Sequence, residues 1–449
     1  AALRAASHGA DVTLIERDLL GGTCLNRGCI PTKALLASAE ALAKARAGEE
    51  FGFEVGGEVR PNFTRMMERK NGVVTQIRGS VEVLLKKAGV KVVHGSGCLT
   101  AVDTVTVDPG EEGAGGETIT MQAGKIIIAT GSEPARLPVF DFDHPAILTS
   151  TSALELERIP ESLLIVGAGA IGCEFASFFA ELGTQITMVE MMPQMLPLED
   201  KRLSKQFQGV YRKRGIQVLL NTKVESIARY ADDHVVAKIS AEKVLVSVGR
   251  TPNTAGLGLE TAGVETDARG YIVVDEYLET TAPGIYAIGD VSGGIMLAHV
   301  ASHEAFVAVD NCLAARPEDR RMRDLRSTPS CTYSHPEVAS VGLNEEQAAE
   351  KGYQPVTGTY RFPALGKAIA LGEGVGYVQI IADKETDLVL GASMMGPRVT
   401  DVIHEIGLAV QNGLTVAQLG NTIHAHPSLA EAVMEAAHDV HGESVHVAK

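Results

Sequence analysis

Two cysteines five residues apart are the side chains of this sequence most suited to chemistry. Cys24 and Cys29 lie in the run Gly21-Gly-Thr-Cys-Leu-Asn-Arg-Gly-Cys-Ile-Pro-Thr-Lys33, shortly after the acid Glu16. Such a pair could be a structural disulfide, half of a metal site or a redox-active dithiol. Zinc sites usually need a second pair of ligands, which the scattered remaining cysteines do not offer. The spacing therefore favours redox work, and a helix predicted over 33–47 would stabilise a thiolate at its N-terminus.

A glycine pattern indicates a second chemical site. The apolar run that begins at Leu163 leads into Gly167, Gly169 and Gly172, and an alanine-rich helix is predicted to follow. In a dinucleotide-binding turn the first glycine allows the tight bend, the second admits the pyrophosphate, and the third packs helix on strand. A glycine-rich packing turn with no ligand is the alternative.

Glu190 indicates which dinucleotide this turn would bind. It lies 23 residues after Gly167, near the spacing expected for an acid that binds a ribose diol. A carboxylate there would repel a 2′-phosphate, and residues 191–196 hold no arginine or lysine. The sequence therefore favours NAD over NADP.

The same unit occurs twice. The segment 9–16, which ends at Glu16, matches the segment 183–190, which ends at Glu190, at an offset of 174 residues. Mapped back by that offset, the three glycines of the turn would fall before residue 1. We therefore expect a first dinucleotide-binding unit whose opening strand and glycine loop precede the given chain.

The pattern Ser428-x-x-Glu431, preceded by Pro427, is a capping box for a predicted helix over 429–437. His424 and His426 lie just before it. By pattern alone, capping is the simpler explanation of Glu431.

Charge and hydropathy exclude several classes of protein. Lys plus Arg is 40 and Asp plus Glu is 56, a net charge of −16, which argues against binding to nucleic acid or an anionic membrane. No stretch of 18 apolar residues is present to span a bilayer. We expect no metal site and a cytoplasmic location.

The cysteine run, together with seven further motifs, resembles the class I pyridine nucleotide–disulfide oxidoreductases. The resemblance covers essentially the whole chain and is strongest to the members that oxidise dihydrolipoamide with NAD. The seven motifs begin at Ala129, Leu163, Val248, Tyr286, Met296, Tyr333 and His424, in the family's order.

The resemblance implies roles for individual residues. Cys24 would exchange with the substrate, Cys29 would lie beside the flavin, His426 would be the acid–base and Glu431 would orient it; His424 is the rival base. The residues implied to bind FAD are Glu16, Gly22, Thr23, Cys24, Lys33, Gly97, Thr130, Gly131, Ser132, Asp290, Met296, Leu297, Ala298 and His299. Those implied to bind NAD are Gly167, Gly169, Ile171, Gly172, Glu174, Glu190, Val224 and Gly249. We expect Glu174 in the first turn of the fingerprint helix.

The implied reaction oxidises dihydrolipoamide to lipoamide and reduces NAD⁺. The substrate would be free or carried on a lipoyl domain of a 2-oxoacid dehydrogenase or glycine cleavage complex. Alternatives are a reductase of the mercuric or glutathione type, or a flavin- and NAD-binding scaffold without redox turnover. The tail 444–449 lacks the cysteine pair of the mercuric type, and Glu190 opposes the NADP preference of the glutathione type.

The implied fold class is α/β, with two Rossmann-like dinucleotide-binding domains and an α+β C-terminal dimerisation domain. The FAD-binding domain spans 1–145, with an exposed glycine-rich hairpin over 107–124. The inserted NAD-binding domain spans 146–255, a central FAD-contacting segment 256–327, and the interface domain 328–449. A homodimer is expected, with His426 acting on the disulfide of the second subunit.

Overall fold

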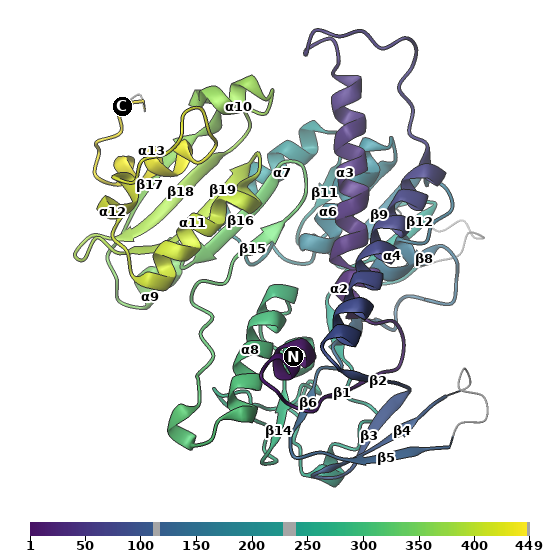
Figure 1. The fold of residues 1–449 in the computed structure, drawn as a ribbon. Coiled ribbons are helices and arrows are strands. Elements are labelled where there is room, and N and C mark those ends of the chain that lie inside the picture. Colours follow the sequence, from purple (N-terminus) through teal and green to yellow (C-terminus); the bar gives the residue numbers. More distant parts are fainter. Residues whose placement is uncertain (111–116, 228–238, 447–449) are drawn as a thin grey trace. The chain divides into compact units, whose positions relative to one another are not determined.

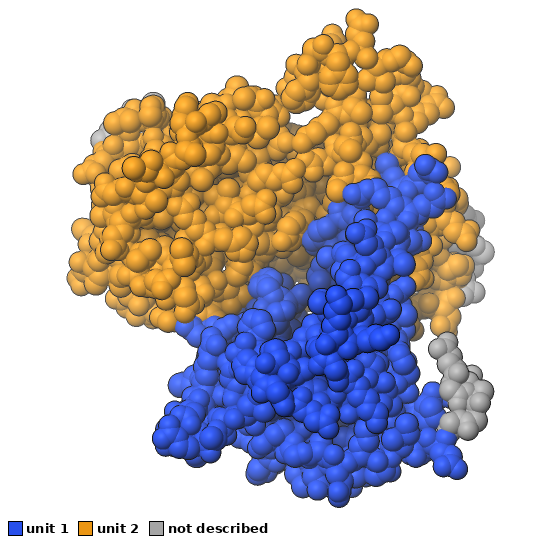
Figure 2. Space-filling model, viewed as in Figure 1, with its two compact units in different colours: residues 1–34, 65–135, 249–324 blue, residues 35–64, 136–248, 325–449 orange. Residues whose placement is uncertain are grey.

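The fold is that of a computed structural model in which residues 1–110, 117–227 and 239–446 are described (Figure 1). By contacts they form two compact units, each made of separate stretches of the chain (Figure 2). The first comprises residues 1–34, 65–135 and 249–324, and the second residues 35–64, 136–248 and 325–449.

The first unit contains short parallel and antiparallel sheets with helices around them. Its elements are α1 (Ala2–Ser7), β1 (Thr13–Glu16), α2 (Gly22–Arg27), the start of α3 (Cys29–Arg46), most of α4 (Phe63–Lys87), β2 (Lys91–His94), β3 (Ser96–Ala101), β4 (Thr104–Asp108), β5 (Ile119–Gln122), β6 (Ile126–Ile128), β7 (Ser132–Pro134), β13 (Arg250–Pro252), β14 (Ile285–Ala287) and α8 (Ala298–Leu313). The pairs β1–β2 and β6–β14 are parallel, β7–β13 is antiparallel, and β3, β4 and β5 form an antiparallel sheet.

Strand β1 ends at Glu16, as the internal repeat predicts. It pairs in parallel with β2, so Glu16 and His94 end at the same edge of the sheet. Apolar side chains of both strands pack with Leu85 and Val90 at the end of α4. The predicted glycine-rich hairpin has its strands in β4 and β5, while residues 111–116 of its turn lie outside the described residues.

The second unit contains a parallel sheet with the strand order β11-β10-β9-β12-β8. Its elements are β8 (Ile147–Leu148), α5 (Ser150–Ala153), β9 (Ser162–Val166), α6 (Ala170–Glu181), β10 (Gln185–Val189), α7 (Lys201–Lys213), β11 (Gln217–Leu219) and β12 (Lys243–Val246). Leu163 to Val166 are all buried, which is typical of a central parallel strand covered on both faces. This sheet carries the glycine fingerprint at the end of β9.

An antiparallel sheet with the order β15-β16-β19-β18-β17 completes the second unit. Its elements are β15 (Ser330–Thr332), β16 (Glu337–Gly342), α9 (Glu345–Glu350), β17 (Pro355–Arg361), α10 (Gly366–Ala370), β18 (Tyr377–Asp383), β19 (Val389–Gly396), α11 (Val399–Asn412), α12 (Val416–Gly420) and α13 (Glu431–Val440). Helix α11 packs on β16 and β19, and α13 packs on β17 and β18. These side chains form the apolar core of the C-terminal part.

The sequence predicts strands over 377–381 and 388–390 and helices over 401–412 and 429–437 in this part of the chain. All four are present, with different bounds. Strand β19 continues to Gly396, well beyond its predicted end at Leu390. Gly391 lies inside this strand, where a Cβ would lie 2.4 Å from the Leu343 carbonyl oxygen. The glycine therefore permits a close approach of the backbone inside the strand. Within the described residues, no helix has both the length and the apolarity needed to cross a bilayer.

Candidate active site

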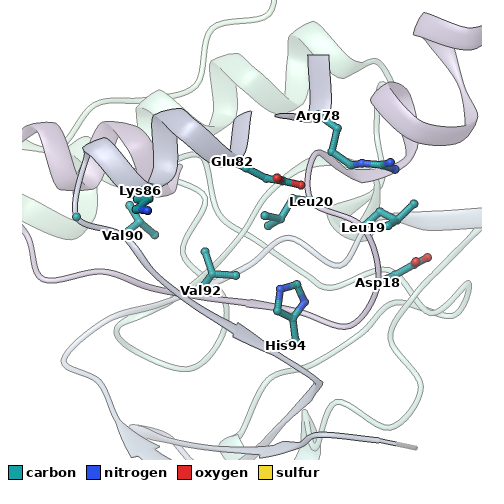
Figure 3. Close-up of a pocket in the computed structure, with 10 residues that line it drawn as sticks. Asp18, Leu19, Leu20, Arg78, Glu82, Lys86, Val90, Val92 and His94 are labelled. Carbon is teal, nitrogen blue, oxygen red and sulfur yellow. The ribbon is translucent and has the colours of Figure 1, made fainter. Parts of the chain in front are cut away.

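A cavity of about 610 Å³ lies in the first unit (Figure 3). It is lined by the C-terminal half of α4, by β2 and by the segment after β1. The bases Arg78, Lys86 and His94 line it together with the acids Asp18 and Glu82. None of the residues expected to react or to bind a cofactor lines this cavity. The candidate active site therefore lies at the cysteines and the glycine turns instead.

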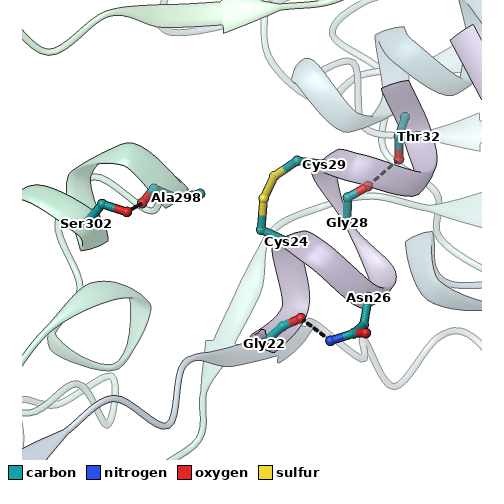
Figure 4. The surroundings of a disulfide bond; sticks show 8 residues. All are labelled: Gly22, Cys24, Asn26, Gly28, Cys29, Thr32, Ala298 and Ser302. Atoms are coloured by element: carbon teal, nitrogen blue, oxygen red, sulfur yellow. Dashed lines mark hydrogen bonds between the residues drawn. A yellow bond between two sulfur atoms is a disulfide. The ribbon is translucent and has the colours of Figure 1, made fainter. Parts of the chain in front are cut away.

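Two helices position the cysteine pair, which forms a disulfide (Figure 4). Cys24 lies on α2 and Cys29 begins α3, with their Cα atoms 4.7 Å apart. Gly28 allows the helices to meet this closely, because a Cβ there would lie 3.2 Å from the Cα of Cys24. The local geometry of the two helices therefore brings the cysteines close enough to form the disulfide. Figure 4 shows the first turn of α8, with Ala298, across from this disulfide.

The predicted start of helix α3 at Lys33 was wrong, because the helix begins at Cys29. Pro31 lies in the first turn of this helix, where proline is well tolerated. The hydroxyl of Thr32 donates to the Gly28 carbonyl oxygen at 2.7 Å. Cys29 thus lies at the positive end of the helix dipole, which favours a thiolate when the disulfide opens. Lys33 stays one turn further along the same helix.

All the residues expected to bind FAD lie in the first unit. Glu16 ends β1, and its Oε1 accepts from the amide of Asp18 at 2.9 Å. Gly131 has φ +69°, and a Cβ there would meet nothing within 4 Å. Met296 to His299 include the N-terminus of α8, where Leu297 supplies no side-chain cap. Open glycine backbone and an uncapped helix end fit a phosphate-bearing ligand.

Asp290 is held by two neighbours from distant parts of the chain. It forms an ion pair with Arg250 at 3.3 Å and accepts from the hydroxyl of Ser132. Arg250 also donates to the Ser132 hydroxyl and carbonyl oxygens, both at 2.6 Å. Arg250 was not among the residues predicted to bind a cofactor, and its only signal was its place in the motif that begins at Val248.

Glu304 is a second residue that sequence reasoning missed. Its side chain is buried in α8, and its Oε2 accepts from the Gly289 amide at 2.7 Å. Its Oε1 pairs with Arg323 at 2.7 Å. Glu304 therefore fixes the turn that presents Asp290. The available signal was an acid directly before the apolar run 305–309 of a helical stretch.

Replacing Glu304 with alanine should lower the free energy of unfolding by about 1–3 kcal/mol, because it leaves the partly buried Gly289 amide without its acceptor. The variant should also lose FAD more readily, since the turn carrying Asp290 loses its support. Chemical denaturation and flavin release on dilution measure the two effects. Glu318→Gln, at an exposed surface pair, is the control. Equal stability of the two variants would contradict the assigned contact.

The glycine fingerprint has the geometry that its sequence predicts. Gly167 has φ +101°, and a Cβ there would lie 2.4 Å from the Ser247 carbonyl oxygen. A Cβ at Gly172 would lie 2.1 Å from the Gly167 carbonyl oxygen, whereas one at Gly169 would meet nothing within 4 Å. Gly169 precedes α6 without a side-chain cap. The open, uncapped helix end fits a dinucleotide pyrophosphate.

Glu190 directly follows β10 and faces this turn. Its Oε2 accepts from the Ala168 amide at 2.7 Å, and its Oε1 accepts from the Met192 amide at 2.8 Å. Val224 packs in the apolar cluster that includes Val166 and Val189, the last residues of β9 and β10. These residues meet at one edge of the parallel sheet. Gly249 belongs to the first unit and Ile171 lies on α6.

The predicted position of Glu174 in the first turn of α6 was wrong. The helix begins at Ala170, so Glu174 lies one turn further along and is buried. Its Oε1 accepts from the Tyr333 amide at 3.0 Å. This hydrogen bond, which the sequence did not predict, joins α6 to the segment after β15 in the same unit.

The C-terminal histidines have different environments. His426 is exposed, with 80% of its side-chain surface accessible, and its Nδ1 lies 2.8 Å from Glu431 Oε1. The side chain of His424 is only 4% exposed, and both of its ring nitrogens have partners. His426 therefore keeps an accessible ring beside a carboxylate, which is the arrangement a general base needs.

The predicted capping box at Ser428 and Glu431 was only half right. Glu431 Oε2 accepts from the Ser428 amide at 2.8 Å, but helix α13 begins at Glu431 with Ala430 as its N-cap. The Ser428 hydroxyl has no hydrogen-bond partner among the described residues. Glu431 thus uses one oxygen for the backbone and the other for His426.

The environment keeps Glu431 ionised. Burial acts to raise the pKa of this carboxyl, but the Ser428 amide, the hydrogen bond to His426 and the charges of His426 and His424 outweigh it. The net result is a pKa below the ordinary value of 4.5. Glu431 can therefore hold the imidazole of His426 in one tautomer at neutral pH. Among the described residues, no group of histidine, cysteine and acids could hold a metal ion.

Comparison with known proteins agrees with this geometry. A dihydrolipoyl dehydrogenase of Bacillus subtilis is 42% identical, over 99% of this chain and 96% of its own length. One of Haloferax volcanii is 39% identical, over 99% of this chain and 94% of its own length.

Two solved structures share the fold. LpdA of Mycobacterium tuberculosis has a TM-score of 0.88 at 27% identity, covering 97% of this chain and 95% of that one. A Cu(II) complex of the HOCl-induced flavoprotein disulfide reductase RclA of Escherichia coli has a TM-score of 0.86 at 30% identity, with the same coverage of both chains.

Two family matches cover most of the chain. Residues 1–305 match the pyridine nucleotide-disulphide oxidoreductases, and residues 328–437 match the dimerisation domain of the same proteins. With this match, the predicted fold class is confirmed. The chain belongs to the pyridine nucleotide-disulphide oxidoreductase family.

Proposed function

We propose that the protein oxidises dihydrolipoamide to lipoamide and delivers the two electrons to NAD⁺. The observation that carries this is the Cys24–Cys29 disulfide, closed between two helices in a chain that matches dihydrolipoyl dehydrogenases over nearly its full length. Glu190 adds the preference for NAD. FAD and NAD are the cofactors of this reaction, and the glycine turns in both units fit them.

The chain's own residues carry out the sulfur chemistry. His426 accepts the proton of a substrate thiol, because Glu431 orients its ring and its Nε2 side is accessible. The substrate thiolate then attacks Cys24 Sγ, the Cys24–Cys29 bond breaks, and Cys29 leaves as a thiolate. The second substrate thiolate attacks the sulfur that is bound to Cys24, which releases lipoamide and the Cys24 thiolate. The substrate is oxidised by two electrons and the protein disulfide is reduced by two.

Bound FAD supplies the step that thiols cannot perform, which is passing the electron pair to nicotinamide as hydride. Asp290, positioned by Arg250 and Ser132, is proposed to bind the ribityl hydroxyls of FAD. Gly169 and the start of α6 are proposed to hold the pyrophosphate of NAD. The other residues predicted to bind each cofactor are part of the same proposal.

The proposed organisation follows the family. The FAD-binding domain is 1–145, the NAD-binding domain 146–255, the central segment 256–327 and the interface domain 328–449. The dimerisation-domain match supports a homodimer, in which His426 would serve the disulfide of the second subunit. The cytoplasmic location and the multienzyme complex that supplies the lipoyl group stay predictions.

A substrate comparison tests this function. The purified dimer, reconstituted with FAD, should form NADH from dihydrolipoamide and NAD⁺. It should not oxidise NADPH with glutathione disulfide or with mercuric ion, the reactions of the two alternative reductases. Absence of dihydrolipoamide turnover in a protein that holds FAD would refute the proposal. Turnover with one of the other oxidants would support the corresponding alternative.

Glu190→Gln should reduce kcat/KM for NAD⁺ by roughly 10- to 100-fold, because a hydrogen bond to a charged group is worth about 1.5–3 kcal/mol. The variant should lose less with NADP⁺, since the repulsion of the 2′-phosphate is also removed. Steady-state rates with both dinucleotides give the ratio. Glu157→Gln removes one charge from an exposed position of the same domain and serves as control. An unchanged ratio of NAD⁺ to NADP⁺ use would exclude Glu190 as the selective residue.

A further inference from the structure

His424 is a buried histidine in the loop that carries His426, and the proposed reaction gives it no task. The loop lies between α12 and α13. The side chain of His424 is 4% exposed, against 80% for His426 two residues later. The burial of this ring and its two hydrogen bonds indicate a structural role close to the proposed base.

Both ring nitrogens of His424 face acceptors. Nδ1 lies 2.7 Å from the carbonyl oxygen of Thr422, and Nε2 lies 2.8 Å from Glu405 Oε1 on α11. A carbonyl oxygen cannot donate, so Nδ1 must carry a proton. The Glu405 side chain is 29% exposed, and a carboxylate that water reaches is an acceptor at neutral pH. Assigned from these partners, the ring carries a proton on both nitrogens and is an imidazolium.

The contacts of His424 also fix the path of the loop. The Thr422 hydroxyl donates to the Gln418 carbonyl oxygen on α12 at 3.0 Å. His424 then links Thr422 to α11, and His426 links to Glu431 on α13. Hydrogen bonds from Thr422 and His424 therefore hold the first half of the loop against α12 and α11.

We propose that His424 is a positioning residue, held as an imidazolium between Thr422 and Glu405, which pins the His426 loop and provides a fixed positive charge beside the His426–Glu431 pair. The inference rests on the proposed function, because it deepens the role of that pair. Glu405 on α11 pairs with it, and its charge acts on Glu431 of α13 together with that of His426 in the loop itself. Its charge acts with the Ser428 amide to keep Glu431 ionised.

A fixed positive charge has a defined consequence for the pH profile. It opposes protonation of His426, so the base stays neutral and active to lower pH than it otherwise would. His424→Gln removes the charge and leaves Glu405 unpaired, and both changes favour a protonated His426. The acid limb of kcat/KM for dihydrolipoamide should therefore move to higher pH by roughly 0.5 unit, a shift set by a charge interaction at intermediate dielectric.

Three variants separate charge from packing. His424→Gln should show the shifted profile, whereas His424→Lys retains a cation near Glu405 and should keep the midpoint close to that of the wild type. The matched control is His441→Gln, because His441 Nε2 pairs with Asp387 Oδ1 at 2.7 Å at the C-terminal end of α13, whereas Glu431 begins that helix. This variant removes the same type of ion pair and should leave the profile unchanged. Superimposable profiles for His424→Gln and the wild type would overturn the proposal.

The protonation state itself is measured without turnover. In FAD-loaded dimer labelled with ¹⁵N-histidine, the signals absent from His424→Gln should report two protonated ring nitrogens at pH 7. Signals of a neutral ring would refute the imidazolium, whatever the activity of the enzyme. Failure of the wild type to oxidise dihydrolipoamide would instead refute the proposed function, so the two outcomes stay distinct.

Discussion

Cys29→Ser should abolish NADH formation from dihydrolipoamide while the protein still folds and binds FAD. The substrate's electrons enter through a sulfur–sulfur bond, and serine cannot form one, so no residual route through the protein is expected. The substitution is small, and it lies at the first residue of α3, a position that serine tolerates well. Stopped-flow mixing with dihydrolipoamide under anaerobic conditions measures the loss.

The two cysteines should differ in their spectra. In the proposed arrangement Cys24 exchanges with substrate and Cys29 lies beside the flavin. Cys24→Ser should therefore retain a long-wavelength thiolate–flavin absorbance that Cys29→Ser lacks, although both are inactive. The reverse pattern would exchange the roles of the two residues.

Cys312→Ser is the matched control for both cysteine variants. Burial is the main cause that raises the pKa of the Cys312 thiol to about 12, so this thiol stays protonated and unreactive at neutral pH. Its replacement should leave turnover unchanged. Loss of activity comparable to that of Cys29→Ser would show that the assay responds to stability rather than to the disulfide.

His426→Gln should lower kcat for dihydrolipoamide oxidation by about 100- to 10,000-fold, the usual contribution of a positioned general acid–base. The exposed ring next to Glu431 can take the thiol proton, whereas glutamine cannot. Oxidation of NADH by ferricyanide should be nearly unaffected, because it needs no thiol deprotonation. Equal losses in both assays would contradict the role of His426.

The contribution of the His426–Glu431 pair to stability changes with pH in a direction that follows from the lowered pKa of Glu431. The pKa of Glu431 is lowered, so its carboxylate stabilises the folded loop above the ordinary value of 4.5 and loses that contribution only as pH falls through the lower, folded value. Between pH 5 and 8 Glu431 therefore stays charged, so its own protonation does not contribute to changes in activity over that range. In Glu431→Gln the carboxylate that orients His426 is absent at every pH. The kcat should therefore be lower at every pH, and no additional titration step should appear in its pH profile.

Several features could be derived from the sequence because they depend on residues close together in the chain. The spacing of Gly167, Gly169 and Gly172 determines one turn of backbone, and each glycine has the conformation or contact expected of it. Cys24 and Cys29 are near enough for two short helices to bring their sulfurs together. The repeated strand-and-acid unit likewise identified the strands that end at Glu16 and before Glu190.

Other features depend on residues far apart in the chain, and only the tertiary structure decided them. Arg250 is 118 residues from Ser132, and their contact to Asp290 has no local pattern. Glu405, a residue on another helix, pairs with the buried ring of His424, whereas the ring of His426 stays exposed beside Glu431, and no sequence pattern indicated this difference. Hydrogen bonding and burial are set by packing between distant segments, whereas spacing in the sequence specifies only the turn and the helix on which a residue lies.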